Sequence, residues 1–204
     1  KSLINIVSHD LTAKAIHHMD RIFPNFVGVL KNFPEAWLQP NFVKVLLGDP
    51  EIDRTELANF WTDFLSELDK IIGLYEAASP NLQSAINESL RQVNTIGGVV
   101  SWAHKWESRL IEILDFPSSP IPTIKNLVPL NSAAAMKAEA LKMRNCLVQM
   151  TPYVIQRRAY FFHWDDDVVP ATVALHKMAD GSWVFHTALG IENKSIPRFL
   201  EFYL

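Results

Sequence analysis

The chain has 204 residues, of which 49% are hydrophobic and 20% charged, and this composition excludes a disordered, collagen-like or disulfide-stapled protein. The formal net charge is -3, so the overall positive charge typical of nonspecific duplex binding is absent. Cys146 is the only cysteine, which excludes an intrachain disulfide and favours a reducing, cytoplasmic location. No apolar run approaches the ~20 residues of a membrane span, so we expect no membrane partner. Because the chain begins with Lys1, we expect a fragment or a trimmed product.

Residues 1–115 have the periodicity of helices. A weak helix is predicted around Thr12 to Phe23. Between Asp53 and Ala78, apolar residues recur at spacings of three and four, which is the period of one buried helical face. A further helix is predicted over residues 80–93, since proline is tolerated in a first turn, and another begins after Gly97-Gly98. Prolines divide the region before residue 53 into short pieces, at Pro24, Pro34, Pro40 and Pro50.

A proline-rich stretch follows. Four prolines fall within residues 116–130, and this composition favours an extended, semi-rigid connection. We therefore predict a helical domain over residues 1–115, a linker over 116–130 and a small α+β domain over 131–204.

The small domain is predicted to begin with a helix and to continue with a sheet. Apolar residues step by four and three from Met136 to Met150, which predicts an amphipathic helix starting at about Ser132. Beyond Pro152 the period changes toward two, and Asp180-Gly181 gives a hairpin signal. Three antiparallel strands are predicted, at residues 159–164, 171–176 and 182–189, followed by a terminal helix over residues 196–204. The predicted fold class is α+β.

The positive charge is concentrated in one segment. Residues 125–158 carry six basic side chains and one acidic side chain, and such a patch suits a phosphate-binding surface. Lys137, Lys142 and Arg144 are therefore candidate nucleic-acid contacts. The alternative is that these side chains only solvate the outer face of a helix.

Three histidines, His163, His176 and His186, lie one on each predicted strand, and imidazoles titrate near neutral pH. A two-residue turn would put His176 and His186 on opposite faces of the sheet, whereas a three-residue loop with a bulge would pair them directly. Arg157 and Arg158 precede the first of these strands and could support the same chemistry.

Other candidate sites are weaker. His163 and Asp165 point the same way in an extended chain and could share a cation, although acids before Pro170 are more typical of a solvated turn. Cys146 is expected to be a packed thiol on a helix, and His104 has no partner at ligand spacing. We expect no metal and no cofactor, since no phosphate-loop, dinucleotide, zinc-protease or serine-hydrolase pattern occurs.

A set of short motifs marks the last third of the chain: Met143-Arg144-Asn145-Cys146, Tyr153, Trp164, residues 170–175, Trp183 and residues 190–193. On these residues, the last third resembles the PcfJ-like domain of conjugative plasmids and phages. The resemblance covers about 60 residues, and the chain departs from the family pattern at Asn145 and at residues 156–158, where a turn containing glycine is expected. It implies a protein of mobile elements with a helical portion ahead of this domain, and it implies no particular reaction.

Two function classes compete. The favoured hypothesis is a noncatalytic interaction module that binds a protein partner through its helical part. The alternative is a module acting on RNA or single-stranded DNA, such as a metal-independent ribonuclease or toxin-like domain. Ribonuclease chemistry needs a base for the 2′-hydroxyl, an acid for the leaving oxygen and a cation for the phosphorane; the strand histidines with Arg157 and Arg158 are residue types that supply these. A third class is a metal-dependent enzyme built on His163 and Asp165.

Overall fold

The computed structural model describes residues 28, 30–47, 54–122, 124–166 and 169–196. The chain divides into two compact units, Lys1–Arg109 and Leu110–Leu204, which are described separately. The predicted helix at residues 12–23 and nearly all of the one at 196–204 lie outside the described residues. Within those residues, none of the helices has the length and apolar composition to span a bilayer.

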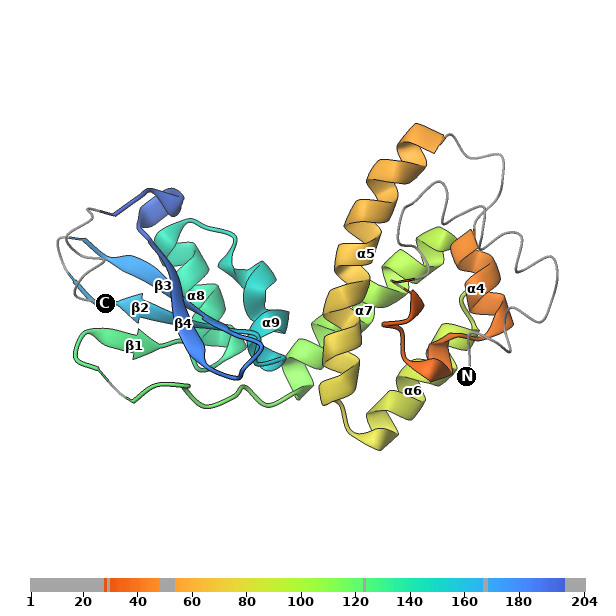
Figure 1. The fold of residues 1–204 in the computed structure, drawn as a ribbon, viewed down its shortest axis with the longest axis horizontal. Helices are drawn as coiled ribbons and strands as arrows, with labels where there is room; N and C mark the ends of the chain where they lie inside the picture. Colours follow the sequence, from red (N-terminus) through yellow and green to blue (C-terminus); the bar gives the residue numbers. More distant parts are fainter. Residues whose placement is uncertain (1–27, 29, 48–53, 123, 167–168, 197–204) are drawn as a thin grey trace. The chain divides into compact units, whose positions relative to one another are not determined.

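The first unit is helical (Figure 1). Its described elements are the short helix η1 (Glu35–Trp37), α4 (Pro40–Leu47), α5 (Arg54–Ala77), α6 (Pro80–Arg91) and α7 (Ile96–Ile113), whose last turn belongs to the second unit. The predicted helices at residues 53–78 and 80–93 are therefore confirmed. The helix predicted after Gly97-Gly98 is also present, but it begins earlier, at Ile96, so both glycines lie in its first turn.

Trp37 lies at the centre of this helical core. Its side chain is fully buried, and its ring makes edge contacts with Tyr75 and Trp102, both with centroids 5.1 Å away. Its indole Nε1 donates to Asn87 Oδ1 at 3.0 Å. Because a buried indole N–H needs an acceptor, this bond ties the loop before α4 to α6.

The second unit combines helices with one antiparallel sheet, so the α+β class is confirmed. Its helices are α8 (Ala133–Met143), η2 (Leu147–Met150), α9 (Thr151–Ile155) and η3 (Ile191–Asn193). The sheet order is β1-β2-β3-β4 (Figure 1). The strands are β1 (Leu127–Pro129), β2 (Ala159–Trp164), β3 (Ala171–Lys177) and β4 (Trp183–Leu189).

Two details of this unit differ from the sequence prediction. The sheet has four strands instead of three, because β1 lies inside the segment predicted as a linker and pairs with β2. The predicted helix over residues 132–150 is interrupted at Arg144, which has a left-handed backbone (φ 52°) and ends α8. The apolar spacing continues past this break, so periodicity alone does not reveal it.

Candidate functional site

A buried carboxylate joins α8 to the sheet. Glu139, on α8, is only 4% exposed, and its Oε1 accepts hydrogen bonds from His163 Nδ1 on β2 at 3.0 Å and from Thr172 Oγ1 on β3 at 2.7 Å. His163 and Thr172 are direct cross-strand neighbours, so one oxygen is held by both strands. A buried charge needs such partners, because an unpaired carboxylate in a core is strongly destabilising.

The second ring nitrogen of His163 is also occupied. A carboxylate only accepts hydrogen bonds, so Nδ1 carries the proton, and Nε2 accepts from the Lys142 ammonium at 2.9 Å. Asp165 Oδ1 is 3.9 Å from Nε2. In the third hypothesis, His163 and Asp165 share a metal ion. Such an ion would have to displace the Lys142 ammonium, which already occupies Nε2.

The other two strand histidines contact each other. The rings of His176 and His186 are stacked, with centroids 3.8 Å apart and planes at 12°. Neither predicted register is present: His176 pairs with Val184, and a bulge falls between Ala174 and Leu175, so that His186 is the unpaired residue of β4. Burial, and then the His186 charge, lower the pKa of His176.

The remaining candidate cations are dispersed. The Arg144 guanidinium pairs with Glu192 at 3.4 Å, both being exposed, and Lys137 is exposed on α8. Arg158 lies over the Tyr153 ring, with the guanidinium carbon 5.2 Å from the ring centroid. Cys146 is exposed rather than packed, because α8 ends before it. Thus three of these cations have separate partners: Lys142 contacts His163, Arg144 pairs with Glu192 and Arg158 lies over Tyr153.

Arg157 instead lies at a cleft, which we call the Arg157 cleft. It has a volume of about 180 Å³ and combines two cations with an indole, a phenol and a serine-proline segment. Its lining residues are Pro117, Ser118, Ser119, Pro120, Arg157, Tyr160, Lys177 and Trp183.

The backbone at Arg157 is unusual. It has φ 57°, in the left-handed region that favours glycine. The turn is closed by two hydrogen bonds, from Arg157 N to Val154 O at 2.8 Å and from Arg158 N to Tyr153 O at 2.9 Å, which is the pattern that ends many helices. Glycine is the usual residue at this position of such a turn, and the chain has an arginine there.

The sheet supplies the opposite side of the Arg157 cleft. Lys177, the last residue of β3, and Trp183, the first residue of β4, are cross-strand partners, and Lys177 N donates to Arg158 O at 3.0 Å. Tyr160 is 1% exposed, and its hydroxyl donates to Pro117 O at 3.4 Å. Burial raises the pKa of Tyr160, so its hydroxyl remains a neutral donor at physiological pH.

Neither cation of this cleft has a counter-ion among the described residues. The Arg157 guanidinium and the Lys177 ammonium make no hydrogen bond or ion pair within that part of the chain, and both side chains are exposed. Sequence reasoning found Arg157 but missed Lys177, Trp183 and Tyr160. The register of the β3–β4 hairpin would have placed Lys177 opposite Trp183. The turn signal at Asp180-Gly181 alone does not determine that register.

Comparison of the chain with protein-family models, with curated proteins and with solved structures gave no match.

The buried carboxylate generates a stability prediction. Thr172→Val removes a hydrogen bond to a charged acceptor without a large change in volume, so we expect the free energy of unfolding to fall by about 2 kcal/mol in urea titrations. The control is Thr187→Val on β4, where we expect a change within about 0.5 kcal/mol. Equal effects of the two substitutions would contradict the role given to Glu139.

The histidine stack generates a pH prediction. Because its folded pKa is lowered, His176 takes up a proton less readily in the folded chain than in the unfolded chain, so its contribution is a loss of stability as pH falls below about 6.5. His186→Ala removes the charge next to His176 and part of the side-chain surface that buries the His176 ring. We expect the drop in melting temperature between about pH 7.5 and 5.5 to become smaller in this variant, and an unchanged drop would contradict the coupling.

Proposed function

We propose that the second unit binds single-stranded nucleic acid, RNA in the first instance, at the Arg157 cleft. One observation carries the proposal: two cations without counter-ions, Arg157 and Lys177, line the same cleft as the indole of Trp183. Phosphate groups pair with guanidinium and ammonium groups, and nucleobases stack on aromatic rings. The ligand class that combines both chemistries is a nucleotide chain.

The backbone at Arg157 supports this proposal. A left-handed conformation disfavours a side chain by about 1–2 kcal/mol relative to glycine, and in this chain the position carries arginine with φ 57°. Strained residues cluster at binding sites, where the surrounding structure holds them in place, and here two backbone hydrogen bonds close the turn. The side chain of Arg157 is exposed, so core packing does not account for it.

A single strand suits the cleft better than a duplex does. Stacking on Trp183 requires an unpaired base, because the faces of paired bases are covered by their neighbours. The chain also has a net charge of -3, so long-range attraction to a duplex is weak. We therefore expect the protein to contact only one or two nucleotides and not to bind a long stretch of the strand along an extended basic surface.

Cleavage of RNA stays a prediction. In the β-pleat, successive side chains point to opposite faces, so His176 lies on the other face of the sheet from its neighbour Lys177. His163 is engaged with Glu139 and Lys142. Among the three strand histidines, the stacked His176 and His186 are therefore the remaining candidates for acid-base chemistry. Incubation of labelled RNA with the protein tests for cleavage products.

Association with mobile elements and a cytoplasmic location likewise stay predictions. The first is based on the family resemblance and the second on the single cysteine.

Arg157→Gly separates binding from folding. We expect the affinity for a fluorescein-labelled oligouridine to fall about tenfold, which corresponds to one phosphate contact of about 1.4 kcal/mol, and the salt slope to fall by about 0.7. Stability should not fall, and should rise by up to about 1 kcal/mol, since glycine relieves the left-handed strain. Fluorescence anisotropy and thermal unfolding measure the two effects.

The control is Arg91→Ala, which removes an exposed arginine from α6, where it pairs with Glu88. This variant should bind the oligonucleotide as the unmodified protein does. Failure of the unmodified protein to bind oligouridine or its deoxy counterpart at low salt contradicts the proposal, as does unchanged binding by Arg157→Gly.

A second proposal concerns the first unit. We propose that it binds a protein partner, which is supported by a cleft of about 320 Å³ between η1, α4 and α6, lined mainly by apolar residues and bordered by Asn87 and Arg91. Clefts of this size, with apolar walls and a few polar groups, receive side chains of partners.

Ala36 borders this cleft and is exposed on η1. Ala36→Arg should fill the entrance and weaken binding of a purified partner at least tenfold, whereas Glu35→Arg, next to it and outside the lining, should not. Calorimetry with the purified partner measures the difference. Equal affinities for the two variants would locate the partner elsewhere.

A further inference from the structure

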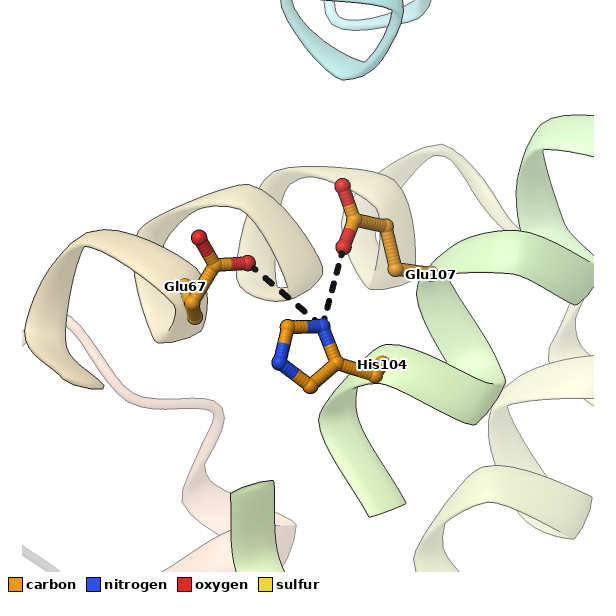
Figure 2. A group of neighbouring side chains, drawn as sticks. All are labelled: Glu67, His104 and Glu107. Carbon is orange, nitrogen blue, oxygen red and sulfur yellow. Dashed lines mark ion pairs between the residues drawn. The ribbon is translucent and has the colours of Figure 1, made fainter. Parts of the chain in front are cut away.

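Three potential metal ligands meet where α5 and α7 lie together in the first unit (Figure 2). Glu67 comes from α5, and His104 and Glu107 come from α7, three residues apart and therefore on one helical face. One ligand atom from each lies within 4.8 Å of the other two. The sequence analysis found no partner for His104 at ligand spacing. The structure corrects this prediction, because Glu107 on the same helix and the distant Glu67 both lie 3.9 Å from its Nδ1.

The imidazole is centred between the two carboxylates. His104 Nδ1 is 3.9 Å from Oε2 of Glu67 and 3.9 Å from Oε2 of Glu107, and Figure 2 shows this nitrogen directed toward the gap between them. Both separations are too long for hydrogen bonds. Ligands bound about 2.1 Å from one ion lie about 3.0–3.4 Å apart, so His104 and each carboxylate would need to approach each other by about 0.5–0.9 Å around an ion.

The Glu67 carboxylate is held in place before any ion arrives. Lys70 Nζ lies 2.6 Å from Glu67 Oε1, which leaves Oε2 directed toward His104 and fixes the carboxylate, as outer contacts do in metal sites. The side chains of Glu67 and Glu107 are 26% and 18% exposed.

We propose that Glu67, His104 and Glu107 bind one divalent first-row transition-metal ion, with zinc and manganese as the best fits. Imidazole nitrogen combined with carboxylate oxygen suits these ions, whereas calcium and magnesium prefer oxygen ligands alone. Three protein ligands leave further positions for water, which is the arrangement of open rather than closed metal sites. His104 is 57% exposed, so the site opens to solvent. This inference is independent of the nucleic-acid proposal, which concerns the other unit.

Metal titration of the full chain tests the site. Protein treated with a chelator and desalted is titrated with zinc or manganese chloride in a calorimeter, and with cobalt chloride while visible absorption is recorded. We expect one ion per chain, a cobalt spectrum typical of mixed nitrogen and oxygen ligation, and a rise in melting temperature when metal is added.

Substitutions locate the ion. His104→Ala and Glu107→Gln should each weaken binding at least tenfold, and neither should show the metal-dependent rise in melting temperature. His104 is half-exposed, so its removal should leave the fold intact, which circular dichroism checks. Glu88→Gln and His186→Ala remove the same two functional groups elsewhere and should bind as the unmodified chain does. Absence of saturable binding overturns the proposal, as does unchanged affinity in His104→Ala.

Discussion

The second unit depends on one buried charge. The Glu139 carboxylate comes from a helix, its two donors come from adjacent strands, and removing any partner would leave a polar group without compensation in a closed core. Apolar contacts between α8 and the sheet tolerate small sliding movements, but a carboxylate shared by His163 and Thr172 does not. The orientation of α8, and with it the position of Arg144 and the turn that follows, is set by this interaction.

Left-handed residues determine where the chain turns after α8 and after α9. Arg144 ends α8 and Arg157 follows α9, both with positive φ, and neither is glycine. At Arg144 the side chain has an ionic partner in Glu192. At Arg157 two backbone hydrogen bonds close the turn, but the guanidinium has no such ionic partner among the described residues. This difference between the two arginines supports the proposal that Arg157, and not Arg144, contacts a ligand.

Much of the fold could be predicted from the sequence, and the site could be predicted only in part. Long apolar periodicities identified α5 and α7, and alternation identified β2 to β4. Strand β1 was not predicted, because three residues in a proline-rich segment are too few to show an alternating pattern. Its formation depends on pairing with β2. The pairing of Glu139 with His163 joins residues 24 positions apart, and Glu67 reaches His104 only because two helices lie together. Such contacts depend on tertiary placement, which composition and spacing do not encode.

The bulge at His186 has a consequence for the behaviour of the sheet in concentrated solution. β4 is an outer strand and carries two exposed apolar side chains, Val184 and Phe185, a combination that invites lateral addition of another chain. The extra residue interrupts the regular alternation of donors and acceptors that an incoming strand would need. The opposite border, β1, is three residues long and ends in Pro129, which lacks a donor. Both edge strands of the sheet are thus poor templates for the addition of a strand from another chain.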